Sequence, residues 1–488
     1  MMWFEELARE IKEKKKDRPI RFFVSTMVTP SGPIHLGNLK EVMIGHLVAM
    51  ALKKAGCEVS FNFFADNYDY LRRCYPFLPA SYQRYVGISL SEVPDPEGCH
   101  KSYDQHFLQP FLKALSILEI RPQIHYMDQL YKSGVYAPLI KKALESREQI
   151  AQIISRISGR TLPKDWSPFM PRCRRCQKIS TTTVKEVDFQ HNTVFYQCQC
   201  GDKGESDFAK GEGKLVWRVH WPAGWKIFGV DVEGFGKDLG TRGGAYDTAK
   251  VIVKEVFQGE PPFPIPYEWV YLKGQGKMAG STGIGLIPLE VLEVLPPQIL
   301  TYFYQRTRPN RHHEFDLQKT VLELWDEFGG LSGIPVRHLL MTIQSHHSFD
   351  STLDSLKRTG YEQVVKEKEE QIKEEIPYLR KWLEKYAPNE LRFQVQKTLP
   401  QVRLTDNQKK FLSNFLKTVV EKKMTSGEEM HRELHSLKKQ LQIPPQEAFS
   451  AIYRIFLGQD YGPQAGWFLA GLDRRFLVRR LQEAVEKL

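Results

Sequence analysis

The chain has 488 residues and a formal net charge of +11, and no apolar run approaches the roughly 20 residues that span a bilayer. The first 18 residues are charged and amphipathic and lack the apolar centre of a secretory signal. These features predict a cytoplasmic protein of two to four domains that does not associate with membranes. The positive charge favours a polyanionic partner, most simply a nucleic acid, but charge alone is weak evidence for one.

The N-terminal region has the pattern with which a parallel α/β sheet begins. Residues 21–27 are apolar and of strand length, residues 29–33 favour a turn, and apolar residues recur at helical spacing over 39–51. Gly56 is expected to end that helix, and residues 59–66 form the next strand. The order strand, loop, helix, strand predicts an α/β fold with a doubly wound parallel sheet of the Rossmann type.

The rest of the chain changes character twice. Residues 162–215 are rich in cysteine, threonine and glycine, which suggests a small insertion, and strand patterns nearly disappear beyond residue 296. We therefore predict a Rossmann-type catalytic domain over residues 1–300, a connecting helical region over 301–350 and an all-helical domain over 351–488.

The turn between the first strand and the helix contains His35, Gly37 and Asn38. A helix N-terminus offers free N–H groups and the positive end of the helix dipole, so it suits a phosphate group. Gly37 lets a nucleotide approach the backbone, and His35 can donate a hydrogen bond to a phosphate oxygen. The alternative is an ordinary loop with a surface histidine.

A second segment, residues 273–283, places two lysines among glycines and hydroxyl side chains. Such a loop can close on a triphosphate and neutralise charge as pyrophosphate leaves. By itself the segment is more typical of a flexible basic surface loop.

Four of the seven cysteines, Cys173, Cys176, Cys198 and Cys200, fall within 28 positions. Two close pairs of thiolates can complete a tetrahedral zinc site, and four protein ligands leave no open position for catalysis. We favour a structural zinc ion, with free or redox-active thiols as the alternative.

Together, the two glycine-containing segments resemble the two ATP motifs of class I aminoacyl-tRNA synthetases. Further blocks resemble class I lysyl-tRNA synthetases, in the order of that family and over nearly the whole chain. They include TPSGPIHLGNLKEV, FADNYDYLRR, WPAGWKIFGVDVEGFGKD, YEWVYLKGQGKM and AIYRIFLGQDYGPQAGWFLAGL. The resemblance implies ATP-dependent activation of an amino acid with Mg²⁺, transfer to tRNA, and a helical domain that contacts the anticodon arm.

The resemblance also implies roles for individual residues. The expected catalytic residues are His35, Asn38, Lys277 and Ser281. Further contacts to ATP are expected from Gly37, Gly236, Asp238 and Met278. The expected amino-acid-binding residues are Met27, Thr29, Asp66, Tyr68, Asp69, Trp225 and Tyr267. Aromatic and arginine side chains such as Trp467, Phe468 and Arg480 suit RNA binding, but such aromatics are more often helix-packing core, so no anticodon residue is assigned.

The sequence departs from the family pattern at the expected substrate site. Met27 stands where the family has a glycine, and Leu239 and Gly240 stand where it has two histidines. The second motif carries Ala279, Gly280 and Thr282 in place of two serines and a lysine.

These departures leave three functions open. The leading prediction is a lysine–tRNA ligase that acts on a lysine-accepting tRNA. The second is a paralogue that activates another amino acid or serves a purpose outside translation. The third is a catalytically weak tRNA-binding protein that keeps the fold.

Overall fold

The computed structural model describes residues 2–15, 21–280, 283–422, 424 and 426–487. The chain forms two compact units. The first comprises Met1–Leu292 and Leu300–Phe315, and the second comprises Glu293–Ile299 and Asp316–Leu488. Among the described residues, none of the helices is both long and apolar enough to cross a membrane.

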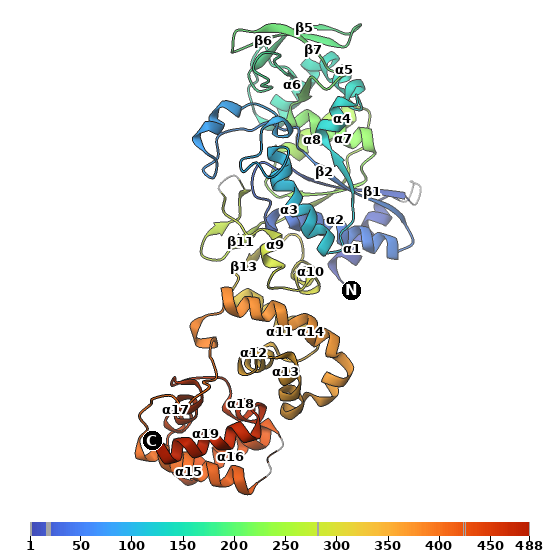
Figure 1. The fold of residues 1–488 in the computed structure, drawn as a ribbon. Coiled ribbons are helices and arrows are strands. Elements are labelled where there is room, and N and C mark those ends of the chain that lie inside the picture. The colour runs from blue at the N-terminus through green and yellow to red at the C-terminus, as the bar shows by residue number, and fades with distance from the viewer. Residues whose placement is uncertain (1, 16–20, 281–282, 423, 425, 488) are drawn as a thin grey trace. The chain divides into compact units, whose positions relative to one another are not determined.

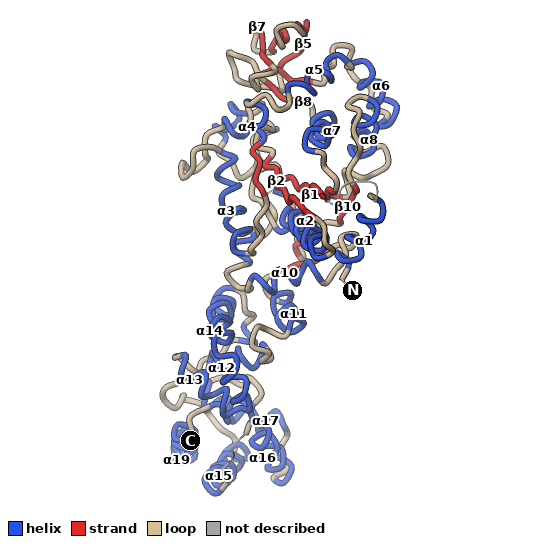
Figure 2. The backbone as a smooth tube through the Cα atoms, turned by 90° about the vertical axis from the view of Figure 1, so that its right-hand side faces the viewer, coloured by secondary structure: helices blue, strands red, loops and turns tan. Residues whose placement is uncertain are grey.

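A five-stranded sheet forms the centre of the first unit, in the order β10-β9-β1-β2-β3. All neighbouring strands are parallel, which confirms the predicted parallel α/β sheet. Figure 2 shows these strands in red. They are β1 (Arg21–Val28), β2 (Glu58–Ala65), β3 (Gln123–Tyr126), β9 (Val232–Gly236) and β10 (Phe263–Tyr267). The chain winds from β1 towards β3 and later from β9 towards β10, so the order reverses between β1 and β9. Ligands of such sheets bind at the carboxyl ends of the strands beside that reversal.

Helices cover both faces of the sheet (Figure 1). The helices of the first unit include α1 (Trp3–Lys14), α2 (Leu36–Lys54), α3 (Tyr103–Ile117), α4 (Met127–Lys132), α5 (Ala137–Glu145), α6 (Arg147–Ser158), α7 (Trp217–Phe228), α8 (Ala245–Glu255) and, beside β11 (Val270–Leu272), the short α9 (Pro288–Val291). A Cβ on Gly45 of α2 would lie 2.5 Å from Cγ2 of Thr26. Glycine at this position therefore lets α2 approach the sheet more closely than any residue with a side chain would allow. Side chains alternate along a strand, and Phe23 of β1 accordingly stacks on Phe228 of α7 on the opposite face.

Smaller sheets flank this core. In the predicted insertion, β5 (Thr182–Asp188), β6 (Thr193–Cys198) and β7 (Lys203–Asp207) form an antiparallel sheet, and β4 (Phe169–Pro171) pairs with β8 (Gly213–Leu215). A third sheet contains β11 (Val270–Leu272), β12 (Gly276–Lys277) and β13 (His313–Phe315). The strand β13 falls where the sequence shows almost no strand pattern, because three residues are too few to establish an alternation.

Among the described residues, the second unit contains helices and loops but no strand, which confirms the all-helical C-terminal region. Its helices are α11 (Lys319–Phe328), α12 (Val336–Ser345), α13 (Phe349–Leu356), α14 (Glu362–Lys385), α15 (Asp406–Glu421), α16 (Gly427–Gln440), α17 (Pro445–Leu457), α18 (Ala465–Gly471) and α19 (Arg474–Lys487). The helix α10 (Pro297–Gln305) contains residues of both units. Phe468 is a buried core residue, and the buried Arg480 donates to the carbonyl oxygens of Ile455 and Gln396, 2.7 Å from each. Both side chains therefore serve helix packing.

Candidate active site

The N-terminus of α2 carries the first predicted motif. Nδ1 of His35 accepts a hydrogen bond of 3.0 Å from the N–H of Gly37, and Oδ1 of Asn38 accepts one of 3.2 Å from the N–H of His35. These reciprocal bonds cap the helix. A Cβ on residue 37 would lie 2.8 Å from the imidazole ring, so this position requires glycine. Burial, with a smaller effect from the charge of Lys277, lowers the pKa of His35 to about 4. The ring is therefore neutral at pH 7, with Nε2 as its donor.

The second motif lies directly against the first. A Cβ on Gly32 would lie 2.8 Å from the carbonyl oxygen of Gly280, and a Cβ on Gly285 would lie 2.7 Å from Cβ of His35. The N–H of Leu36 donates to the carbonyl oxygen of Leu286 at 3.0 Å. The fold thus brings together two segments separated by about 240 residues. Ser281, the fourth predicted catalytic residue, lies outside the described residues.

Lys277 of the second motif and Lys237 both lie over the ring of Trp269. Nζ of Lys277 lies 3.6 Å from the ring centroid of Trp269, and Nζ of Lys237 lies 4.3 Å from the same centroid. Lys237 also pairs with Glu268 at 2.7 Å, whereas Lys277 is exposed at the end of β12. Met278 is buried, and its N–H donates to Val270, which holds this loop on β11. The exposed Lys277 is placed to meet an anionic group.

The carboxyl end of β9 carries Gly236 and Asp238, two of the residues predicted to contact ATP. A Cβ on Gly236 would lie 2.8 Å from Oδ1 of Asp238, so glycine permits this exposed carboxylate to turn back towards the strand. The next strand contributes Tyr267, whose hydroxyl donates to Oε2 of Glu41 at 2.6 Å. The other oxygen of Glu41 accepts from the N–H of Met27 at 2.8 Å. Glu41 therefore joins α2 to the ends of β1 and β10.

A small pocket lies between β1, β9 and α7. Its walls are Ser25, Met27, Phe64, Met127, Tyr136, Trp221, Gly224, Trp225, Phe228, Val230 and Glu233, and its free volume is about 10 Å³. Glu233 is the only carboxylate among these walls, and it accepts hydrogen bonds from both Trp221 and Trp225 and, at 3.0 Å, from Ser25. Burial, together with the charge of Glu41, raises the pKa of Glu233 to about 8. The pocket thus combines aromatic walls with one buried carboxyl group.

Of the residues predicted to bind the amino acid, Met27 and Trp225 line this pocket. Asp66 is buried and pairs with Lys214 at 2.5 Å, and the hydroxyl of Tyr68 donates to the carbonyl oxygen of Gly211. Asp69 pairs with Arg72 at 2.9 Å. Both carboxylates therefore pair with cations of the protein, and only the partner of Asp66 belongs to the inserted module.

Sequence reasoning missed Glu41 and Glu233. Glu41 lies one helical turn after Asn38 and therefore on the same face of α2. This spacing could have identified Glu41 as a neighbour of the first motif. Glu233 interrupts an apolar strand. Because carboxylates are seldom buried without a partner, its position in the strand could have identified Glu233 as a candidate site residue.

Comparison with known proteins decides the family. The model described as tRNA synthetases class I (K) matches residues 1–347. The lysine–tRNA ligase of Methanosarcina barkeri strain Fusaro is 40% identical over 530 residues, which cover 99% of this chain and 97% of the relative. The corresponding protein of Archaeoglobus fulgidus is 38% identical, with 99% and 100% covered. The chain belongs to the class I tRNA synthetases (K). Among solved structures, a glutamate tRNA ligase from Elizabethkingia meningosepticum is 10% identical with a TM-score of 0.49, covering 96% of this chain and 99% of that one.

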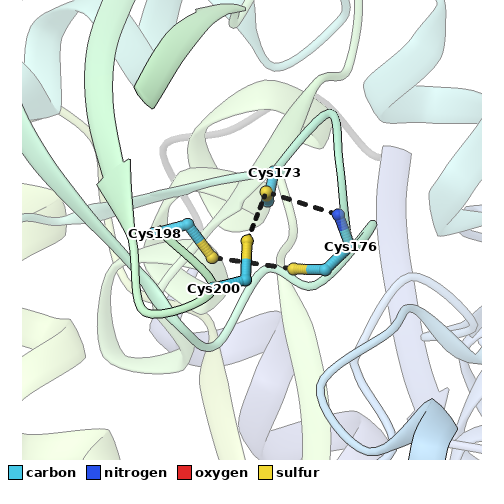
Figure 3. A group of neighbouring side chains, drawn as sticks. All are labelled: Cys173, Cys176, Cys198 and Cys200. Carbon is cyan, nitrogen blue, oxygen red and sulfur yellow. Dashed lines mark hydrogen bonds between the residues drawn. The ribbon is translucent and has the colours of Figure 1, made fainter. Parts of the chain in front are cut away.

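In this class I synthetase, the four predicted cysteines converge in the inserted module (Figure 3). The Sγ atoms of Cys173 and Cys200 are 3.7 Å apart, and those of Cys176 and Cys198 are 3.6 Å apart. Four thiolates at a Zn–S distance of about 2.3 Å around one ion are separated by about 3.8 Å, which these distances match closely. The N–H of Cys176 also points at Sγ of Cys173. The cluster can hold a metal ion.

A second group of possible metal ligands was not predicted from the sequence. Asp95, Cys99, His100 and His106 each offer one ligand atom, and these atoms all lie within 4.8 Å of one another. Sγ of Cys99 lies 3.0 Å from Nδ1 of His100 and 3.4 Å from Nδ1 of His106. The spacing Asp-x3-Cys-His-x5-His was the available signal, because three of the four ligands precede α3 and the fourth lies in its first turn. This mixed set also suits zinc chemically.

Proposed function

We propose that this protein is a cytoplasmic lysine–tRNA ligase that activates lysine with ATP and Mg²⁺ and transfers it to the 3′ end of a lysine-accepting tRNA. The names of the two relatives support this proposal. The observation that carries it is the contact between the Gly32–His35 turn and the loop at Gly280, next to the carboxyl ends of β1 and β9. The two segments face the place where a parallel sheet of this kind binds its ligand.

The first reaction needs positioning more than acid–base catalysis. The carboxylate of lysine attacks the α-phosphorus of ATP, a new P–O bond forms, and the bond to the leaving pyrophosphate breaks. Nε2 of His35 donates to a phosphate oxygen, and Lys277 with Ser281 closes over the charge that develops. Asn38 holds the backbone of His35, while Gly37, Gly236, Asp238 and Met278 shape the nucleotide site. A hydroxyl of the tRNA 3′ end then displaces AMP from the lysyl group.

The pocket beside Met27 has the chemical groups that the side chain of lysine requires. Its aromatic walls accept an aliphatic chain, and Glu233 supplies a partner for a terminal ammonium group. Trp225 forms one wall, and Tyr267 positions Glu41, whose second oxygen fixes the backbone of Met27. Thr29 directly follows β1 and completes the set of residues that we propose for the amino acid. Asp66 and Tyr68 support the site through their contacts with the inserted module, and Asp69 supports it through its ion pair with Arg72.

Zinc is the metal that we propose for the cluster of Cys173, Cys176, Cys198 and Cys200. Four thiolates at tetrahedral separations favour zinc over the oxygen-preferring Mg²⁺. A Cys₄ set fills the coordination shell, so its role is to brace the module. We propose that the group formed by Asp95, Cys99, His100 and His106 also holds zinc.

One observation favours the second function, a paralogue with another substrate. The free volume of about 10 Å³ in the pocket accommodates about one water molecule, and Met27 forms part of the wall at a position where the family has glycine. Lysine can enter only if the methionine side chain turns away. A substrate with a smaller side chain needs less rearrangement.

Exchange of labelled pyrophosphate into ATP separates these functions, measured with each of the twenty amino acids, with and without tRNA. A signal dominated by lysine supports the proposed function. A signal dominated by another amino acid establishes the paralogue. No exchange from folded, zinc-loaded protein under any condition contradicts both and favours a tRNA-binding protein.

A further inference from the structure

The hydroxyl of Tyr136 is a buried polar group in the wall of the proposed amino-acid pocket. Tyr136 directly precedes α5, is only 1% exposed, and lines the pocket together with Met27, Gly224 and Glu233. Among the described residues, nothing forms a hydrogen bond with this hydroxyl. A buried hydroxyl without a partner is costly in free energy, so its place in a pocket wall indicates a partner that arrives with the ligand.

The hydroxyl lies beside Gly224 of α7, a second wall residue. A Cβ on Gly224 would lie 3.1 Å from the hydroxyl oxygen, so a larger residue would crowd this oxygen and cover it. Glycine therefore leaves the oxygen open towards the pocket. Burial raises the pKa of Tyr136, and the charges of Asp66 and Glu233 add to this effect, so the hydroxyl stays protonated. Because the charge of Glu233 acts on Tyr136, the two groups lie near each other in the wall.

The ring of Tyr136 is held in place by its neighbours. It stacks on the ring of Tyr131, with centroids 4.4 Å apart and planes at 6°, and on that of His220, with centroids 5.3 Å apart and planes at 21°. Tyr131 is itself fixed, because its hydroxyl accepts from the N–H of Leu215 at 3.3 Å and lies 2.9 Å from Nδ1 of His220. A phenolic oxygen lies on the axis of its ring, so rotation of the ring does not move it to another partner. The hydroxyl of Tyr136 is therefore preorganised for a ligand.

Glu233 alone does not satisfy an ammonium group. Its carboxyl oxygens accept hydrogen bonds from Ser25 and from two indole N–H groups, which occupy three of the about four acceptor positions of a carboxylate. An ammonium group carries three N–H donors, so in a dry pocket it needs at least one further acceptor. The hydroxyl oxygen of Tyr136 is an acceptor of this kind.

We propose that Tyr136 determines the specificity of this pocket: its hydroxyl oxygen accepts a hydrogen bond from a substrate side chain that ends in an ammonium group, and Glu233 supplies the negative charge. This inference rests on the proposed function, because it concerns the same pocket and the same substrate. A pocket built to bond a polar group rejects the analogue that lacks it, since the buried protein group is then left without a partner. Tyr136 thus favours lysine over apolar side chains of similar length.

The first experiment compares Tyr136→Phe with Tyr131→Phe by ATP–pyrophosphate exchange at varied lysine concentration. We expect the KM for lysine to rise about 10- to 100-fold in Tyr136→Phe, the usual effect of losing one hydrogen bond to a charged group. The kcat should change less than about threefold, because the bond forms equally in the ground state and the transition state. Tyr131 does not line the pocket, so Tyr131→Phe should keep the KM for lysine. An unchanged KM for lysine in Tyr136→Phe would overturn the inference.

Norleucine tests whether the ammonium group is the partner. It keeps the apolar chain of lysine and lacks the ammonium group. Measured as a competitive inhibitor against lysine, it should have the same inhibition constant for the wild type and for Tyr136→Phe. A parallel loss of affinity for lysine and norleucine would show that the substitution deforms the pocket, and the assigned role of the hydroxyl would be rejected.

The melting temperatures of the ligand-free proteins separate binding from structure. Tyr136→Phe removes a hydroxyl without a partner, so it should melt at the temperature of the wild type or above. Tyr131→Phe breaks two contacts and should melt at a lower temperature. A lowered melting temperature of Tyr136→Phe would show that its hydroxyl is bonded in the free protein and would contradict the inference. If Tyr131→Phe does not fold, Tyr82→Phe serves as the control, because this buried hydroxyl donates to the carbonyl oxygen of Pro94 at 3.1 Å, away from the pocket.

The outcomes also separate this inference from the proposed function, if lysine binding is measured by calorimetry beside exchange. Activation of lysine with the same KM in the wild type and in Tyr136→Phe rejects the role of Tyr136 and leaves the ligase function intact. Lysine that binds with an affinity dependent on Tyr136 but is not activated rejects the ligase function and keeps the role of Tyr136. A wild type that neither binds nor activates lysine rejects both.

Discussion

The N–H of Gly37 donates a hydrogen bond of 3.0 Å to Nδ1 of His35. This bond fixes the tautomer of the imidazole, because a nitrogen that accepts carries no proton. The remaining proton lies on Nε2, and the pKa of about 4 keeps the ring neutral in the physiological range. His35 therefore acts as a neutral donor, and the cap that starts α2 also sets the chemistry of the site.

The first prediction concerns His35→Asn. Asparagine is a good helix cap, so α2 should remain intact, but its shorter side chain cannot place a donor as far from the backbone as Nε2 of His35. We expect the maximum rate of ATP–pyrophosphate exchange to fall about 10²- to 10³-fold, the usual cost of losing one donor to a developing charge. The KM for lysine should change little. His46→Asn, at a half-buried position further along α2, is the control, and an equal loss in both variants would reject the assigned role.

The second prediction concerns pH. Glu233 has a pKa of about 8 in the folded protein, above its usual value, so it is largely protonated at pH 6 and ionised above pH 8. An ammonium group binds the ionised form more tightly. The KM for lysine should fall as the pH rises from 6 through 8 and level off only above about pH 9, because the lysine side chain keeps most of its proton in this range.

The same shift in pKa affects stability in the opposite direction. The folded state binds more protons than the unfolded state between the usual carboxyl pKa and pH 8, so the free energy of unfolding should decrease as the pH rises through this window. Glu233→Gln should abolish the pH dependence of the KM for lysine and raise that KM about 10- to 100-fold, through loss of a charge-assisted bond. Glu58→Gln, at an exposed strand end, should keep the wild-type profile, and a pH dependence that survives in Glu233→Gln would assign it to another group, such as Glu41.

The sequence predicts well what depends on neighbours along the chain. The strand, turn and helix around His35 follow from apolar spacing and from the cap, and the resemblance to the family pairs this turn with the loop at Lys277. Contacts that depend on tertiary packing could not be predicted from the local sequence. Nothing local shows that Asp66 is matched by Lys214, 148 positions away, or that Glu233 faces two indole N–H groups from α7.

The third prediction concerns Met27→Gly. Removing this side chain enlarges a pocket that now has about 10 Å³ of free volume. We expect the KM for lysine to fall, with a loss of folding stability of about 0.5–1 kcal/mol because glycine is unfavourable within a strand. Met27→Leu keeps the volume and should behave as the wild type. Unchanged lysine kinetics in Met27→Gly would show that the methionine does not obstruct the substrate.

The fourth prediction concerns metal content. If both clusters hold zinc, the purified protein should contain about two zinc ions per chain, from the ligand sets of the two sites. Cys176→Ser and His106→Ala should each retain about one, and Cys57→Ser, whose buried thiol belongs to neither cluster, should retain both. A wild type with one zinc ion that His106→Ala does not reduce would contradict the second site.

The two metal variants should also differ in activity. His106 lies in the first turn of α3, and the hydroxyl of Tyr103 at the start of that helix donates to the carbonyl oxygen of Ser31 at 2.7 Å, within the first ATP motif. Loosening this turn removes about one hydrogen bond from the nucleotide site, which corresponds to a rise in the KM for ATP of about 2- to 10-fold in His106→Ala. Cys176 lies in the inserted module, so its variant should keep the KM for ATP and lose thermal stability instead. Equal values of the KM for ATP in the two variants would show that α3 does not transmit the state of its metal site to the ATP motif.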